Sequence, residues 1–211
     1  VDYIVKNTVG KLIEGKSPKQ LEKIRILDPA CGSGSFLLGA YQYFLDYHLE
    51  YFRKHPKEAQ TERFDFYQKF DAEDFALPLR TKARILRNNI FGVDIDPQAV
   101  EITMMSLYLK LLEGERSLPS KQALLPTLTY NIRCGNSLIG YDIFDQGSLF
   151  DDETKTRINP FDWKSKTGGF GDIIESGGFD AVIGNPPYGA DFTPEIKEYL
   201  AKKYIHQNYQ F

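Results

Sequence analysis

Residues 24–36, IRILDPACGSGSF, have the pattern of a strand, a glycine-rich turn and the start of a helix. The apolar run over residues 24–27 is typical of a buried parallel strand. Gly32 and Gly34 permit the positive φ angles of a tight turn and let a ligand approach the backbone, although a tight turn alone would also need glycine. The apolar residues that follow recur at helical spacing, and they are Phe36, Leu37, Ala40, Tyr41, Phe44 and Leu45. The segment predicts an α/β unit without the G-x-G-x-x-G spacing of dinucleotide-binding proteins.

A second strand and its following helix are indicated by residues 91–97, FGVDIDP. Asp96 is a favourable N-cap and Pro97 suits the first helical position, so both residues have a structural explanation. Asp94 has no such explanation. An acidic residue at the end of the second strand is placed to accept hydrogen bonds from ribose hydroxyls. Ile95, beside it, would offer an apolar surface to an adenine ring.

Two further strand ends follow along the chain. Residues 131–138, NIRCGNSL, indicate a short third strand that ends in a Gly-Asn turn. Residues 179–188, FDAVIGNPPY, indicate a fourth, buried strand and then a stiff diproline segment that cannot continue a sheet ladder. Taken alone, Asn-Pro-Pro is most often a turn. Because ligands bind at the carboxyl ends of parallel strands, the four ends together predict one crevice for a planar, amino-bearing substrate.

Together the four segments resemble the γ-class DNA adenine-N6 methyltransferases, as in the methyltransferase part of type IIG restriction-modification enzymes and in type I modification subunits. The resemblance implies an α/β, Rossmann-like fold with a doubly wound, mostly parallel sheet that binds S-adenosylmethionine. It assigns cofactor binding to Asp28, Pro29, Ala30, Cys31, Gly32, Gly34, Phe36, Asp94, Ile95, Asn136, Ser137 and Leu138. It assigns catalysis to Asn185, Pro186, Pro187 and Tyr188, and it implies no metal.

The resemblance also implies a reaction, the transfer of a methyl group to N6 of an adenine that has been flipped out of the duplex. The side-chain oxygen of Asn185 and the carbonyl of Pro186 would hold the two amine protons, and Tyr188 would stack on the base. Asn-Pro-Pro-Tyr also occurs in methyltransferases of protein glutamine amides and of RNA guanine, and a catalytically silent cofactor-binding subunit is a further alternative. A nicotinamide-dependent dehydrogenase would leave residues 185–188 unexplained.

The composition is that of a soluble enzyme domain. The chain has 211 residues, of which 42% are hydrophobic, and it shows no signal peptide or membrane-spanning run. Cys31 and Cys134 form neither a disulfide framework nor a metal motif, and Cys31 is better explained as a small loop residue than as a nucleophile. The three histidines, His48, His55 and His206, lack zinc-ligand spacing. We expect a cytoplasmic protein.

A net charge of −3 does not suit a DNA-binding surface. The basic cluster at residues 80–87 is by default a solvated helix face. We therefore expect double-stranded DNA to be the partner of the full-length protein, with target-recognition and nuclease domains in the same or in separate chains. The tyrosine-threonine-proline segment that the family carries upstream is absent, and residues 208–211 resemble the approach to the next family motif. These features predict a fragment, truncated at its C-terminus, that does not read DNA sequence alone.

The domain organisation follows from these patterns. We expect residues 1–211 to be a partial methyltransferase catalytic domain, with a leading helix within residues 1–23 and a cofactor-binding and catalytic core over residues 24–211. The predicted strands are residues 24–28, 89–94, 132–134 and 179–183, and the predicted helices are residues 1–14, 36–52, 80–87, 98–113 and 194–203. Insertions are expected near residues 53–88 and 141–178, the second as a glycine-rich long loop or a family-specific insertion.

Overall fold

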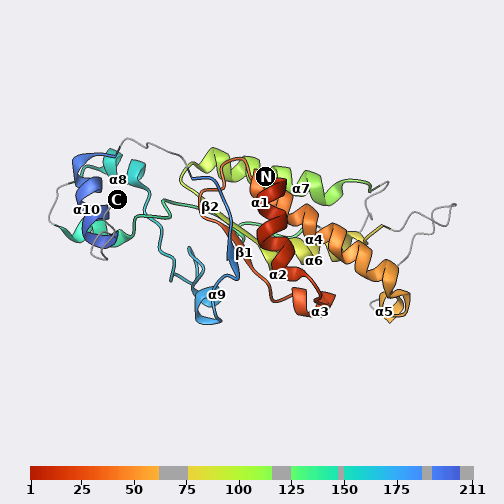
Figure 1. The fold of residues 1–211 in the computed structure, drawn as a ribbon. Helices are drawn as coiled ribbons and strands as arrows, with labels where there is room; N and C mark the ends of the chain where they lie inside the picture. Colours follow the sequence, from red (N-terminus) through yellow and green to blue (C-terminus); the bar gives the residue numbers. More distant parts are fainter. Residues whose placement is uncertain (62–75, 116–124, 147–149, 187–191, 205–211) are drawn as a thin grey trace.

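A parallel sheet forms the core of the structure, a computed structural model that describes residues 1–61, 76–115, 125–146, 150–186 and 192–204 (Figure 1). The described strands are β1 (Ile26–Asp28), β2 (Ile90–Asp94), β3 (Ile132–Cys134) and β4 (Ala181–Val182), in the order β3-β2-β1-β4. Ile26 of β1 pairs with Ile90 on one side and with Ala181 on the other, both in parallel. Because the strand order reverses between β1 and β4, the predicted doubly wound α/β fold is confirmed.

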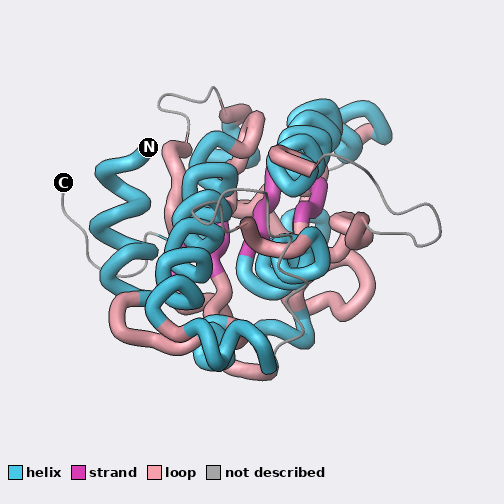
Figure 2. Tube along the Cα trace, turned by 90° about the vertical axis from the view of Figure 1, so that its right-hand side faces the viewer, coloured by secondary structure: helices cyan, strands magenta, loops and turns pink. Residues whose placement is uncertain are grey.

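Three helices form the helical face of the molecule, the layer that covers one side of the sheet (Figure 2). They are α4 (Ser35–Lys54), α6 (Leu79–Asn89) and α7 (Pro97–Leu112), close to the bounds predicted from apolar spacing. Ile26, Ile90 and Ile132 of the strands share one apolar cluster with buried helix residues such as Phe44 and Leu107. Full burial of a large apolar side chain contributes about 1.5–3 kcal/mol, so this layer is the main source of stability.

The leading helix predicted over residues 1–14 is present as three consecutive pieces that run on as one helix in Figure 1. They are α1 (Asp2–Val5), the π-helical turn η1 (Lys6–Gly10) and α2 (Lys11–Ile13), and the short α3 (Pro18–Leu21) follows. Gly39 of α4 allows close packing here, because a Cβ atom on it would lie 2.8 Å from Val1 Cγ1. The residues that join the apolar cluster of the helical face are Val5, Val9, Ile13 and Leu21.

Residues 161–179 cover the opposite side of the sheet and form the aromatic face. The buried cluster on this side consists of Leu27, Phe91, Val93, Phe161 and Phe170. The ring centroid of Phe170 lies 5.8 Å from that of Phe91 and 5.4 Å from that of Phe179, with each pair edge to face. Such aromatic pairs add about 0.5–1.5 kcal/mol beyond the burial of their area. The second layer of the fold is therefore held by rings rather than by long helices.

The long loop or insertion predicted over residues 141–178 is partly helical. It contains η2 (Tyr141–Gln146), α8 (Asp152–Ile158) and α9 (Gly171–Glu175). These helices are too short to show an apolar period, which is why the sequence pattern does not reveal them. The glycines have a packing role instead: a Cβ atom on Gly171 would collide with the carbonyl oxygen of Lys164, so glycine lets the two backbone segments touch.

Strand β4 lies at the edge of the sheet that the structure describes, and its Val182 is 61% exposed. The prediction of a buried fourth strand is therefore wrong for Val182, although the position and direction of the strand are confirmed. The physical reason is that Val182 pairs with Leu27 and so lies on the side of the aromatic face, whose buried cluster does not extend over this edge strand. Ile183, just after the strand, is buried, and its N–H donates to Leu27 O at 2.8 Å.

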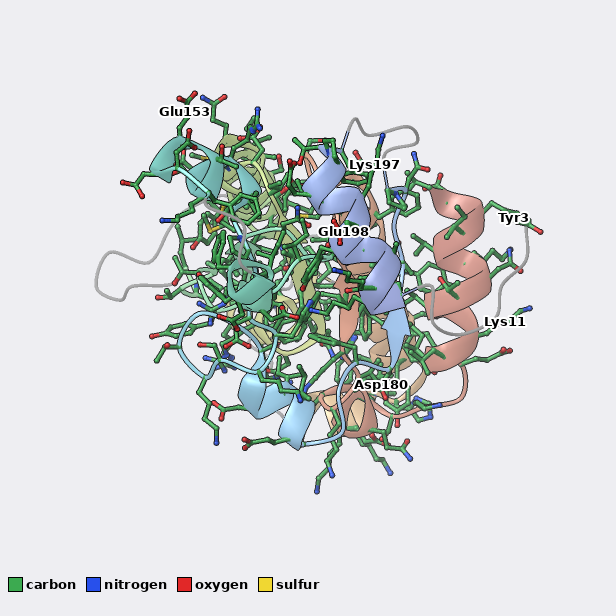
Figure 3. All side chains as sticks on the ribbon, turned by 90° about the vertical axis from the view of Figure 1, so that its left-hand side faces the viewer. Tyr3, Lys11, Glu153, Asp180, Lys197 and Glu198 are labelled. Atoms are coloured by element: carbon green, nitrogen blue, oxygen red, sulfur yellow. The ribbon has the colours of Figure 1, made fainter. Side chains whose placement is uncertain are left out.

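A small helical satellite lies beyond the sheet, on the left of Figure 1, and consists of η2, α8 and α10 (Pro194–Tyr204). Its apolar cluster contains Ile139, Ile143, Ile158 and Tyr199. The Tyr199 hydroxyl accepts from the Gly140 N–H at 3.0 Å and donates to Asp142 Oδ1 at 2.6 Å. Glu153 of α8 and Lys197 of α10 are exposed on the outside of the satellite (Figure 3). Helix α10 confirms the last predicted helix.

The insertion predicted near residues 53–88 contains α5 (Pro56–Thr61) and α6, and residues 62–75 lie outside the described residues. The division of the chain into a leading helix and a core stays a prediction. Among the described helices, none combines the length and the apolar character that crossing a bilayer requires.

Candidate active site

The predicted site segments meet at the carboxyl-terminal edge of the sheet. The loop after β1 is joined to β2 through the Cys31 N–H, which donates to Val93 O at 3.0 Å. The segment after β3 is joined to the end of β2 by the Gly135 N–H, which donates to Asp94 O at 2.8 Å. These backbone bonds place three of the four predicted strand ends side by side, as the motif order had indicated.

Gly32 and Gly34 have different roles in the loop after β1. Both have positive φ angles, +53° and +83°. A Cβ atom on Gly34 would lie 2.9 Å from Thr103 Cγ2, so this glycine is required for packing against α7, whereas a Cβ atom on Gly32 would meet nothing within 4 Å. Gly32 therefore faces open space that a ligand can enter.

Thr103, which the sequence patterns did not single out, supports the same loop. It lies on α7, is fully buried, and its hydroxyl donates to Gly32 O at 2.7 Å. The sequence carries no clear signal for this role, because Thr103 is one of several polar residues in α7. The contact holds the backbone of Gly32 against α7.

Asp94 has a structural role that the sequence did not indicate. Its Oδ2 accepts from the Gly32 N–H at 2.7 Å and its Oδ1 accepts from the Asp96 N–H at 3.0 Å. Each carboxylate oxygen retains a further lone pair, so the group remains able to accept from ribose hydroxyls. Asp96 caps α7 as predicted, because its side chain accepts from the Gln98 N–H at 2.9 Å.

Asp28 is buried at the end of β1, with 1% of its surface exposed. Burial raises the pKa of its carboxyl to about 6; the hydrogen bond from the Ala30 N–H opposes this rise, and the charge of Asp94 adds to it. A cation placed nearby would favour the ionised form and lower this pKa again. The charge of Asp28 near neutral pH therefore depends on the charges placed beside it.

The other residues assigned to cofactor binding in and just after this loop are Pro29, Ala30, Cys31 and Phe36. Pro29 and Ala30 are half-buried, and Phe36, on the first turn of α4, packs against the cluster of the helical face. Cys31 is buried, and burial raises the pKa of its thiol to about 12. The thiol is therefore protonated at neutral pH, which agrees with the interpretation of Cys31 as a small loop residue.

Two exposed apolar side chains lie just after β2 and in the segment after β3. Ile95 is 45% exposed and Leu138 is 49% exposed, although both are large apolar side chains. Asn136 Oδ1 accepts from the Leu138 N–H at 3.1 Å, and Ser137 O accepts from Trp163 Nε1 at 3.0 Å. Exposed apolar side chains on two neighbouring strand ends fit a flat ring such as adenine.

The predicted catalytic segment, residues 185–188, follows shortly after β4. Asn185 and Pro186 are exposed, and Pro187 and Tyr188 lie outside the described residues. A Cβ atom on Gly184 would lie 2.6 Å from Asp28 Oδ1, so only glycine lets the backbone pass this carboxyl. Gly184, just before the predicted catalytic segment, and Asp28, at the end of β1, are therefore in direct contact at the point where the strand order reverses.

The basic cluster at residues 80–87 is not a solvated helix face throughout. Lys82 is 9% exposed, and its Nζ donates to Glu113 O at 2.9 Å and to Glu115 Oε1 at 2.8 Å. Arg84 Nη1 lies 3.4 Å from Glu22 Oε1. The default interpretation is wrong for Lys82, because helix α6 turns this residue toward α7 and uses its charge to join the two helices.

Two family models match the chain. The model described as "N-6 DNA Methylase" matches residues 4–131, and the model described as "Eco57I restriction-modification methylase" matches residues 88–211. Between them they include all four predicted site segments. Each covers more than half of the chain.

Individual relatives point in the same direction. The chain is 32% identical over 218 residues to the type II restriction enzyme and methyltransferase RM.Eco57I of Escherichia coli, covering 100% of this chain and 20% of that protein. It is 27% identical over 171 residues to the adenine-specific methyltransferase PglX of Streptomyces coelicolor, covering 79% of this chain and 12% of that protein. The chain thus spans a fifth or less of the length of these curated relatives.

Among solved structures, the chain is similar to a nuclease-deletion mutant of the type ISP restriction-modification enzyme LlaGI in complex with a DNA substrate mimic. The match covers 89% of this chain and 12% of the LlaGI chain. The TM-score is 0.45 and the sequence identity is 18%.

Proposed function

Because this chain belongs to the N-6 DNA methylase family, we propose that the complete protein transfers a methyl group from S-adenosylmethionine to N6 of adenine in DNA, within a restriction-modification system. One observation carries the proposal furthest: Gly184, next to Asn185, touches Asp28, the first residue of the glycine-rich turn. This contact supports a site in which the glycine-rich turn after β1 would hold the cofactor and residues 185–188 would act beside it, at the reversal point of the strand order.

The residues at this edge fit S-adenosylmethionine, which supplies an electrophilic methyl group. Asp94 would accept from the ribose hydroxyls, while Ile95 and Leu138 would flank the adenine ring and Asn136 would meet its polar edge. Gly32 leaves room for the rest of the cofactor, because nothing lies within 4 Å of its Cβ position. Asp28, held partly protonated by burial, would ionise opposite the positive charge of the cofactor.

Asn185 and Pro186 would act on the target amine rather than on the cofactor. The N6 nitrogen of adenine is a weak nucleophile because its lone pair is delocalised into the ring. As the nitrogen attacks, its protons become more acidic, so hydrogen bonds to the Asn185 side-chain oxygen and the Pro186 carbonyl grow stronger in the transition state. Tyr188 would stack on the flipped base, and the released proton would pass to solvent.

Double-stranded DNA is the proposed substrate of the complete protein, and the cytoplasm is its proposed location. The chain carries a net charge of −3, and the buried Lys82 removes one cation from its most basic cluster. Phosphate contacts and sequence readout therefore have to come from elsewhere, in a target-recognition domain of the same polypeptide or of a partner. The name of RM.Eco57I combines a restriction enzyme with a methyltransferase, which supports a nuclease in the same system.

The cofactor part of the proposal is tested by calorimetry of S-adenosylmethionine binding to this chain. Asp94→Ala is expected to weaken binding by about 1–3 kcal/mol, the scale of hydrogen bonds to a charged group. The matched control is Asp96→Ala, which removes an exposed carboxylate two residues away and the cap of α7, at a cost of about 1 kcal/mol in stability, but leaves binding unchanged. Binding of NAD in place of S-adenosylmethionine, or equal affinity in Asp94→Ala and wild type, would contradict the assignment.

A further inference from the structure

Asn159 connects two of the loops that form the proposed cofactor site, although no sequence motif includes it. Its Nδ2 donates to Ile95 O at 3.1 Å and lies 3.3 Å from Cys134 Sγ. Its main-chain oxygen accepts from the Asn136 N–H at 2.6 Å. One residue at the end of α8 therefore contacts the carboxyl ends of both β2 and β3.

The backbone conformation of Asn159 explains why asparagine stands here. With φ of +44°, it is the one non-glycine residue of positive φ among the described parts of the chain. Asparagine tolerates this left-handed conformation better than most residues, as does glycine. Glycine would supply the turn but no donor for Ile95 O, and aspartate would place a charged acceptor against that carbonyl. The position requires both the conformation and the amide.

Two other asparagines show what a purely structural connection of this kind looks like. Asn89 Nδ2 donates to Leu21 O and Ile24 O, both at 2.6 Å, and Asn131 Nδ2 donates to Arg87 O and Ile90 O, both at 2.8 Å. Asn89 and Asn131 are buried, with 1% and 2% of their surface exposed. They fix the amino ends of the strands, at the edge of the sheet opposite to the proposed cofactor site.

Asn159 differs from these two in place and in burial. It is only half-buried, and it fixes the carboxyl ends of β2 and β3, from which the exposed side chains of Ile95 and Leu138 project. We propose that Asn159 is a positioning residue that sets the separation of Ile95 from the segment Asn136–Leu138, and so the width of the slot that takes the adenine ring of the cofactor. This inference rests on the proposed function, because it deepens the assignment of that same site.

Asn159→Gly is the informative variant, because it keeps the left-handed turn and the main-chain acceptor for the Asn136 N–H and removes only the Nδ2 donor. We expect it to raise the dissociation constant of S-adenosylhomocysteine about threefold to tenfold, the range of one lost hydrogen bond. Asn159→Asp should weaken binding further, since its carboxylate faces the Ile95 carbonyl. In both variants, the loss of affinity for S-adenosylhomocysteine should be larger than the loss of stability, measured as the fall in melting temperature, can account for.

The matched control lies at the other end of the same seven-residue helix. Asp151 Oδ1 caps α8 by accepting from the Thr154 N–H at 2.8 Å. Asp151→Ala therefore destabilises α8 without touching β2 or β3, and it should leave the dissociation constant within about twofold of wild type. A loss of affinity in Asp151→Ala as large as in Asn159→Gly would overturn the inference, because general weakening of α8 would then explain both.

A second measurement, amide hydrogen exchange of the cofactor-free chain, reports on the slot directly. Asn159→Gly should speed exchange of the Gly135 and Asn136 amides and leave the Ile183 amide, at the end of β4, unchanged. If wild type binds S-adenosylhomocysteine and Asn159→Gly binds it equally well, or if exchange at Gly135 and Asn136 is unaltered, the positioning role is wrong and the proposed function stands. If wild type does not bind the ligand at all, the proposed function fails and takes the inference with it.

Discussion

The helical face and the aromatic face cover the same sheet by different means. On the helical face, α4, α6 and α7 pack long apolar stripes against Ile26, Ile90 and Ile132. On the aromatic face, an irregular glycine-bearing segment places Phe161 and Phe170 against the opposite side of the strands. The first layer shows its period in the sequence, and the second does not, because ring contacts and tight turns have no period.

The two faces also differ in what they contribute to the site. The helical face supports the cofactor loop through the Thr103 hydroxyl and the Gly32 carbonyl. The aromatic face reaches the carboxyl-terminal edge of the sheet itself, where Trp163 Nε1 donates to Ser137 O, and Asn159, just before this segment, donates to Ile95 O. The helical face therefore contributes most of the stability, whereas the residues on the other side of the sheet contact the site segments directly.

The largest effect is expected on the helical face. Phe44→Ala removes a fully buried ring between helices that cannot collapse into the space, and it should lower the free energy of unfolding by about 3–5 kcal/mol. Urea unfolding followed by far-UV circular dichroism measures this loss. Tyr3→Ala, at a residue 80% exposed, serves as the control and should stay within about 0.5 kcal/mol of wild type.

A smaller and more local effect is expected on the aromatic face. Phe170→Ala also removes a buried ring, but the surrounding segment is irregular and relaxes more easily, so we expect a loss of about 2–3 kcal/mol. Amide exchange should increase over residues 161–179 and remain slow in α4. If Phe170→Ala lowered the free energy of unfolding as much as Phe44→Ala does, with amide exchange rising in both layers, the two faces would unfold as one unit. That result would contradict the difference between the faces.

The smallest effect concerns Asp28, between the two faces. Because its pKa rises from 3.8 in the unfolded chain to about 6 in the fold, the folded protein holds this proton more tightly. The resulting stabilisation is complete below pH 3.8 and is lost as the pH rises through about 6. Asp28→Asn should therefore be more stable than wild type at pH 8, by up to about 2 kcal/mol, and the difference should vanish near pH 4.

Chemical denaturation at the two pH values, without cofactor, measures this difference. Saturating S-adenosylmethionine sharpens the result, since its positive charge should favour ionised Asp28 in wild type and reverse the advantage of Asp28→Asn. An Asp28→Asn variant that is less stable than wild type at both pH values would contradict the direction of the pKa shift.

Much of the fold could be predicted from the sequence, and the reason is local regularity. The strand, turn and helix of residues 24–36 and the capped start of α7 at Asp96 are encoded within a few residues. Helices η2, α8 and α9 were not predicted, because each is too short to show a period. The exposure of Val182 was missed for another reason, since burial of a strand depends on its neighbours and not on its own composition.

The site was predictable to the extent that it lies in contiguous motifs. The order of the strand ends was enough to bring Gly32, Asp94 and Asn136 to one edge. The supporting contacts were not predictable, because they join residues far apart in the chain: Asn159 is 64 positions from Ile95 and Thr103 is 71 positions from Gly32. No pattern within a window of a few turns marks such pairs.

Methyl transfer by the complete polypeptide tests most directly whether the carboxyl ends of β1 and β4 carry the active site. Wild type and Asn185→Ala are incubated with labelled S-adenosylmethionine and DNA, and the digested nucleosides are separated to identify the methylated base. We predict N6-methyladenine from wild type and a rate about 10²–10³-fold lower from Asn185→Ala, as for the loss of a transition-state hydrogen bond, with cofactor affinity within about twofold. Comparable turnover in the two proteins, or label on a nucleoside other than N6-methyladenine, would contradict the account.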